Sequence, residues 1–323
     1  MAIPGVATSH HTQQITAGKP VPTLRLPADP LWVTAIGCHF NSSLNDLHFF
    51  NWLIDQGVNV WMFSPAEAEE SELSLGQFLV NATVNGDIAR EALFIIEQLG
   101  KIDAGTAAWL QQRQAQKRPI NPIDHAQGYQ YSLHPKLLEQ QLSHSLARLQ
   151  LYTLDWVVLE DPPLLHRVIQ GEAADVLFTA MLKMEKLARE ELLRSYGLAL
   201  PYSAISDNTL WLERLLQVHE SMCLKLNLSP EESAFRGLLF THLHDLHGLT
   251  QERVSLWGKT ETLPNALQRL NWWAFSLAST ENVSTLFTPS LPIYPFPVLV
   301  SSQHFTIWRS SGSTLPNPTD IKT

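Results

Sequence analysis

The sequence predicts an α/β protein built as a (β/α)8 barrel. Predicted strands and helices alternate along most of the 323 residues, which is typical of a parallel sheet. The strand candidates are apolar on both faces, as in Val58–Met62 and Leu154–Leu159, and such strands are buried between two layers. We count about seven or eight strand–helix units, which favours a barrel over an open sheet. No G-x-G-x-x-G follows a strand, so an open dinucleotide-binding sheet has no support.

The elements of the first half follow from hydrophobic spacing. Strand candidates are short apolar runs, and helix candidates repeat apolar residues every three or four positions. In chain order they are the strand Leu31–Phe40, the helix Leu44–Gln56, the strand Val58–Met62, the helix Ser71–Leu79 and the helix Asp103–Gln116. Gly57 ends the first of these helices. Ala92–Leu99 fits a strand or a helix by periodicity alone.

The second half continues the alternation. Pro135–Leu149 carries its leucines on one side and predicts a strongly amphipathic helix. The elements after it are the strand Leu154–Leu159, the helix Ala173–Arg194, the strand Leu193–Leu200, the helix Asn208–Leu224, the strand Phe235–Phe240, the helix Leu263–Ser279 and the strand Val283–Phe287. We therefore expect a flexible N-terminal arm over residues 1–22, a barrel over 23–290 and a Pro-rich tail over 291–323. Within the tail, Ile293–Val300 either covers the barrel or docks on a partner.

Composition excludes several classes of protein. The net charge is −9 and no Lys/Arg-rich block occurs, which argues against nucleic acid as a partner. Cys38 and Cys223 are the only cysteines, so a disulfide framework is excluded. No apolar run is long enough to span a bilayer, and the N-terminus lacks a secretory signal. We expect an intracellular protein, soluble or peripherally bound to a complex, and the low charged fraction of 16% favours protein partners.

One long segment carries a resemblance to a known family. It opens with Ser132-Leu133-x-Pro135, continues through Ser145-Leu146-x-Arg148-Leu149 at a helix end, and reaches Asp155 at the start of a buried strand. This order resembles the central signature of the aldo-keto reductases. Further segments fall in the family's order: Gly57-Val58-Asn59, Ser71-Glu72-x-x-Leu75-Gly76, the strand from Arg90 to Gly100, and Ala266–Ser279 followed by Val283–Pro289. The resemblance covers roughly residues 25–290.

The resemblance implies a (β/α)8 barrel that reduces carbonyl groups with NADPH. In the family a tyrosine is the general acid, a lysine and an aspartate tune it, and a histidine orients the carbonyl. At these positions this sequence has Glu67 for the tyrosine, Gln98 for the lysine, Met62 for the aspartate and Glu160 for the histidine. The polar pair that holds the nicotinamide amide is replaced by Ala199 and Leu200. The short span between His247 and Leu263 indicates a barrel that is shortened around its seventh unit and C-terminus.

Three hypotheses arise from these replacements, the third being a protein that keeps cofactor binding but not catalysis, as a redox sensor does. The first is a non-catalytic aldo-keto-reductase-like protein that serves as a structural, assembly or regulatory subunit of a larger complex and binds no cofactor. The alternative is an NADPH-dependent oxidoreductase, or another barrel enzyme, with altered acid–base chemistry at Glu67 and Glu160. NADP(H) is the family cofactor if any is bound. We expect no metal, and His242, His244 and His247 are weak candidates that a polar loop explains better.

Overall fold

Strands and helices alternate along the chain in the computed structural model. The structure describes residues 2–306 apart from 20, 27–28, 41–45, 118–119, 121, 125–127, 201–209, 241–272, 278–297 and 304. These ranges hold all the strands and helices named in this section.

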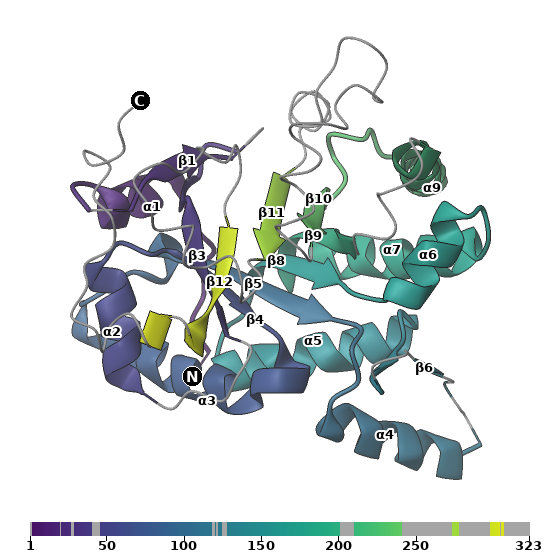
Figure 1. Cartoon of the computed structure of the whole chain (residues 1–323), viewed down its shortest axis with the longest axis horizontal. Helices are drawn as coiled ribbons and strands as arrows, with labels where there is room; N and C mark the ends of the chain where they lie inside the picture. Colours follow the sequence, from purple (N-terminus) through teal and green to yellow (C-terminus); the bar gives the residue numbers. More distant parts are fainter. Residues whose placement is uncertain are drawn as a thin grey trace.

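Eight parallel strands close into a barrel (Figure 1). In the order of their hydrogen-bonded neighbours they are β10 (Phe235–Phe240), β11 (Trp273–Leu277), β12 (Val298–Ser301), β3 (Ile36–Phe40), β4 (Val60–Phe63), β5 (Phe94–Leu99), β8 (Leu154–Leu159) and β9 (Leu193–Leu200). The last of these pairs with the first and closes the ring. The predicted (β/α)8 barrel is confirmed. The segment between β10 and β11, where the sequence suggests a shortened seventh unit, lies outside the described residues.

Helices cover the outside of the ring (Figure 1). They are α2 (Leu47–Asp55), α3 (Pro65–Asn85), α5 (Pro135–Leu149), α6 (Pro162–Ile169), α7 (Ala174–Arg189) and α9 (Leu210–Leu226). Pro65 and Pro135 occupy first-turn positions, where the missing N–H costs no hydrogen bond. Between β5 and β8 the chain forms α4 (Ala104–Ala115) and the short hairpin of β6 (Ile123–Asp124) and β7 (Gln130–Tyr131).

Alternating side chains fill the barrel. The inward positions are apolar and include Val60 and Met62 on β4, Phe94 and Ile96 on β5, Trp156 and Val158 on β8, Ala199 on β9, Leu239 on β10, Phe275 on β11 and Leu299 on β12. The outward positions pack against the helices in a second, larger core. Both faces of each strand are therefore buried, which explains why the strands read as continuous apolar runs.

The N-terminal end of the barrel is closed by the segment before the first barrel strand. The antiparallel hairpin of β1 (Thr23–Arg25) and β2 (Trp32–Thr34) follows α1 (Ser9–Thr16). Leu26, Leu31 and Val33, together with Ala7, pack against the interior cluster. Any site for a ligand inside the ring must therefore open at the C-terminal ends of the strands.

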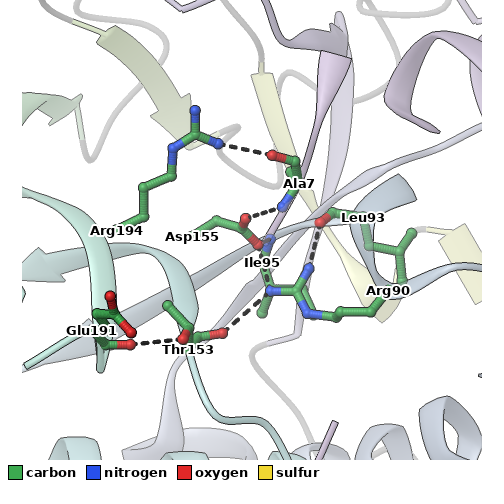
Figure 2. Close-up of polar contacts among 8 residues, drawn as sticks. All are labelled: Ala7, Arg90, Leu93, Ile95, Thr153, Asp155, Glu191 and Arg194. Atoms are coloured by element: carbon green, nitrogen blue, oxygen red, sulfur yellow. Dashed lines mark hydrogen bonds and ion pairs between the residues drawn. The ribbon is translucent and has the colours of Figure 1, made fainter. Parts of the chain in front are cut away.

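An ion pair fixes this closed end (Figure 2). The guanidinium of Arg90, from the short 3₁₀ helix η1 (Arg90–Ala92), lies 2.6 Å from the Asp155 carboxylate. The same carboxylate accepts hydrogen bonds from the backbone N–H groups of Ala7 (2.5 Å) and Ile95 (2.9 Å). Arg194 donates to the carbonyl oxygen of Ala7 at 2.8 Å. Asp155 thus joins the N-terminal segment, β5 and β8.

Four expectations differ from the structure or lie outside it. The helix predicted over Leu263–Ser279 is wrong at its end, because β11 occupies Trp273–Leu277. β12, at Val298–Ser301, lies in the segment expected to be a tail and pairs with β3. The N-terminal arm contains α1, with Thr12 fully buried, and is tied to Asp155. The strand expected at Val283–Phe287 lies outside the described residues.

Among the described helices, none combines the length and the apolar character that crossing a membrane requires.

Candidate active site

Polar side chains gather at the C-terminal end of the barrel interior. Side chains two residues apart on a strand point to the same face. His39 follows the inward position of Gly37, Ser64 follows Met62, Gln98 follows Ile96, and Glu160 follows Val158. Each of these polar residues therefore lies one step above the apolar interior, at the mouth of the ring. The end of a TIM barrel where strands terminate is where its active sites are found.

Three of these side chains form a buried hydrogen-bond chain. The Nε2 atom of His39 lies 2.9 Å from Ser64 Oγ, and Ser64 Oγ donates to Gln98 Oε1 at 2.5 Å. The side chains are 8%, 4% and 7% exposed, respectively. A serine hydroxyl has one proton. Because Ser64 gives this proton to Gln98, the His39 Nε2 must donate to Ser64, and the Gln98 amide nitrogen must face away from it.

The arrangement gives Gln98 a fixed direction. Its carbonyl oxygen is held by Ser64, so its NH₂ group is the end that remains to donate to another acceptor. The position is the one where the resemblance places a lysine. A neutral donor there stabilises negative charge on a bound oxygen less strongly than an ammonium, but it does so without a charge to desolvate.

The other site positions predicted from the resemblance lie in different parts of the structure. Met62 is fully buried in the barrel interior and contributes only apolar surface. Glu160 is half-buried at the mouth, and its backbone N–H donates to Leu99 O at 2.7 Å. Glu67 lies in the first turn of α3, but its side chain is outside the described part of the structure. The structure therefore brings Gln98 and Glu160 to one mouth and does not test the pairing of Glu67 with Glu160.

Sequence reasoning missed His39 and Ser64. His39 lies inside an apolar run that predicts only a strand, and Ser64 directly follows one. The signal was available, because a histidine two residues after an inward glycine must point into the barrel. The register Phe63↔Glu97 then places Ser64 beside Gln98, and the register His39↔Met62 places His39 two residues below Ser64 on the neighbouring strand.

Asp161, next to Glu160, is a structural carboxyl group at the same end of β8. Its side chain accepts the backbone N–H of Leu164 at 2.9 Å and caps α6. Burial raises the pKa of Asp161 to about 6, and the capping hydrogen bond opposes this shift. The group therefore titrates close to neutral pH beside the mouth.

A second buried carboxyl pair lies behind the mouth, on the outer face of β5. Glu97 is fully buried, and its carboxyl group lies against Glu72 and Ser145. Glu72 of α3 lies beside it and pairs with Arg148 of α5, with Nε to Oε2 at 2.5 Å. Burial, and then the Glu72 charge, hold the pKa of Glu97 well above its usual range. This cluster fastens the helix layer to the strand that carries Gln98.

No metal centre emerges from the described residues, which contain no group of three or more His, Cys, Asp or Glu side chains able to share an ion. The weak candidates His242, His244 and His247 lie outside the described part of the chain.

Comparison with known proteins finds similar structures but no similar sequences. No protein-family model and no curated protein matches the chain. An aldo-keto reductase of Bacillus halodurans in its holo form superposes with a TM-score of 0.55, at 11% identity, over 93% of this chain and 94% of that one. An inferred aldo-keto reductase of Pseudomonas aeruginosa superposes with a TM-score of 0.55, at 14% identity, over 95% of this chain and 100% of that one.

The fold is that of the aldo-keto reductases. A looser match is the aldo/keto reductase of Klebsiella pneumoniae in complex with NADP and acetate, with a TM-score of 0.47, 15% identity, and coverage of 92% of this chain and 78% of that one. The expectation of a non-catalytic subunit is wrong, because the solved structures that share this fold are enzymes by name. The alternative, a barrel enzyme with altered acid–base chemistry, agrees better with these neighbours.

The aldo-keto reductase fold implies a nicotinamide cofactor, and the described residues fit it in part. Met62, Val158 and Ala199 belong to one apolar cluster beneath the mouth, but they are at most 1% exposed and present little surface to a planar ring. Ala199 points inward and Leu200 packs in the outer core, so neither offers a polar group to a carboxamide. The interior beneath the mouth is therefore apolar, as a nicotinamide ring requires, whereas the carboxamide contacts that the resemblance implies are missing from this strand.

Proposed function

We propose that this chain is an oxidoreductase that acts on a carbonyl group at the C-terminal mouth of the barrel, with a proton-supplying system different from the family's tyrosine and lysine. One observation supports it above the others: His39, Ser64 and Gln98 form a connected, buried polar chain at the mouth of an otherwise apolar ring. Buried polar groups of this kind cost stability unless they are satisfied, so a chain of them at a barrel mouth favours a catalytic role.

In this proposal the three side chains together stabilise and protonate the carbonyl oxygen of the substrate. The Gln98 NH₂ group donates to that oxygen and stabilises the negative charge that develops when the carbonyl carbon is reduced. When the substrate is bound, the Ser64 hydroxyl turns from Gln98 Oε1 and gives its proton to the substrate oxygen, and a protonated His39 replaces it through Nε2. The oxygen, still bonded to carbon, becomes the hydroxyl group of the alcohol product, which then leaves the site. Ser64 is restored, and His39 is left neutral until solvent protonates it again.

NADP(H), the cofactor of the reductases that the chain resembles, would bind at the mouth, above the apolar interior formed by Met62, Val158 and Ala199. When bound, this cofactor supplies the hydride that reduces the carbonyl carbon. Glu160 lies at the rim of the mouth, where its carboxyl group can accept a hydrogen bond from a hydroxyl group of the substrate.

The test is NADPH oxidation by the purified full chain with a panel of aldehydes and ketones. Ser64→Ala and His39→Gln should each lower kcat by about 10²-fold, as expected for loss of a general acid, with KM little changed. Gln98→Leu should lower kcat by about 10²-fold through loss of oxyanion stabilisation. Ser143→Ala, on the exposed surface of α5, is the matched control and should leave turnover unchanged. A wild-type protein that neither binds NADPH nor reduces any of the carbonyls would overturn the proposal.

A further inference from the structure

A pocket of about 380 Å³ lies on the outer side of the barrel wall, between α6, α7 and α9. These three helices lie together on one side of the barrel (Figure 1). The pocket does not include any residue of the mouth, so a ligand bound there would be independent of the proposed function. Its volume is within the range of small-molecule sites.

The inner wall of the pocket is apolar. Val168 of α6 and Val218 of α9 are buried, and Phe178 of α7 is half-buried between them and solvent. An apolar group of a ligand would leave water on entering this part of the pocket, which favours binding.

The remaining wall carries one cation and one anion. Arg214 of α9 and Asp175 of α7 both line the pocket. Within the described part of the chain, neither side chain forms an ion pair, with the other or with any third residue. A Cβ atom placed on Gly171 would lie 3.5 Å from Cζ of Arg214, so the turn after α6 passes directly beside the guanidinium and limits its movement.

We propose that this pocket binds a small zwitterion with an apolar side chain, of the size and charge of a free apolar amino acid. A guanidinium binds a carboxylate through two parallel hydrogen bonds, so Arg214 would take the carboxylate. Asp175 would take the ammonium group, and the apolar side chain would pack against the wall formed by Phe178, Val168 and Val218. A ligand with only one of the two charges would leave one charged side chain of the pocket without a counter-charge. A simple carboxylate would also lie close to the like charge of Asp175.

The test is calorimetric titration of the full chain with L-phenylalanine, 3-phenylpropionate and phenethylamine. These ligands share the ring and carry both charges, only the negative charge and only the positive charge, respectively. L-phenylalanine should bind at least ten-fold more tightly than either analogue. Arg214→Gln and Asp175→Asn should each weaken its binding at least ten-fold. Glu172→Gln removes an exposed charge from the same region without lining the pocket, and should leave binding unchanged.

A filling variant separates the pocket from other sites on the protein. Ser221 is exposed on α9 and lines the pocket, so Ser221→Trp should block it without disturbing the core, which circular dichroism checks. Loss of L-phenylalanine binding in this variant supports the assignment. Equal affinity for 3-phenylpropionate and L-phenylalanine, binding that survives Ser221→Trp, or no binding of L-phenylalanine to the wild type would each overturn it.

Discussion

Arg90 and Asp155 form an ion pair of 2.6 Å whose side chains are 1% and 0% exposed. Asp155 begins β8 and also accepts the backbone N–H groups of Ala7 and Ile95. One carboxylate therefore satisfies donors from two distant parts of the chain, the N-terminal segment and the segment from Arg90 to Ile95. The pair lies at the closed end of the barrel, opposite the mouth, so its role is to hold the ring together.

Replacing Asp155 by Asn should destabilise the protein strongly. The substitution leaves the Arg90 guanidinium buried without a counter-charge, which typically costs about 3–5 kcal/mol. Urea unfolding followed by circular dichroism measures the loss as a lower midpoint. Glu172→Gln is the control, because it breaks the exposed pair of Arg167 and Glu172 and should change stability by less than about 1 kcal/mol. Equal effects of the two substitutions would contradict the structural role of Asp155.

Replacing Gly76 by Ala should loosen the contact between α3 and α5. A Cβ atom on Gly76 would lie 2.2 Å from the carbonyl oxygen of Arg148, so the two helix backbones must separate to admit it. Overpacking of this kind costs about 1–3 kcal/mol. Gly105→Ala in α4 is the control, since the nearest atom to its Cβ is 3.6 Å away and alanine favours a helix. Thermal unfolding should show a lower Tm for the first variant and an equal or higher Tm for the second.

The sequence predicts the parts of the fold that depend on local chemistry. The two motifs that resemble the aldo-keto reductases meet in space: Glu72, from the first, pairs with Arg148, from the second, and Gly76 admits the backbone of Arg148. The geometry of this contact requires these residue types, and the resemblance is therefore visible in a single sequence. The helix Pro135–Leu149 and the strands Leu154–Leu159, Leu193–Leu200 and Phe235–Phe240 are likewise confirmed to the residue.

The wrong predictions concern segments whose local hydrophobic pattern does not decide which element they form. The apolar run Trp273–Leu277 fits a helix or a strand, and only its neighbours in the ring make it β11. Val298–Ser301 follows a Pro-rich stretch that reads as a tail, yet it becomes β12 by pairing with β3. At the site, positions taken from the resemblance located Gln98 and Glu160, but His39 and Ser64 become partners of Gln98 only through the register of three strands.

Replacing Glu97 by Gln should stabilise the protein at high pH more than at low pH. The folded-state pKa of Glu97 is raised well above 4.5, so the folded protein holds this proton more strongly than the unfolded chain. The stability of the wild type therefore falls as the pH rises above about 4.5, whereas glutamine has no proton to lose. Urea midpoints at pH 4.5 and pH 8 should show a difference between variant and wild type that grows with pH.

The matched control for this measurement is Glu190→Gln. Glu190 is exposed and faces Lys186 one turn earlier, so its substitution should shift the urea midpoint little and by the same amount at both pH values. A Glu97→Gln variant whose difference from the wild type is constant between pH 4.5 and pH 8 would show that Glu97 is not a buried proton-holding group.

Replacing Asp161 by Asn should remove a pH dependence near neutrality. The pKa of Asp161 is raised from 3.8 to about 6 in the folded protein, so the wild type loses stability as the pH rises through this interval. A shift of this size corresponds to about 3 kcal/mol. Asparagine caps a helix as well as aspartate does, so α6 keeps its cap while the titration disappears. The variant should match the wild type near pH 4 and exceed its stability at pH 8.

The comparison with Asp161→Ala isolates the cap from the charge. Alanine cannot accept the Leu164 N–H, so this variant should be less stable than Asp161→Asn by about 1 kcal/mol at every pH. Both variants lack the titrating carboxyl group, and their unfolding midpoints should therefore run parallel between pH 4 and pH 8, while that of the wild type falls relative to both. If the unfolding midpoint of the wild type instead stays parallel to those of the two variants, the carboxyl group of Asp161 ionises with its ordinary pKa in the folded protein. Burial beside the mouth would then not hold its proton.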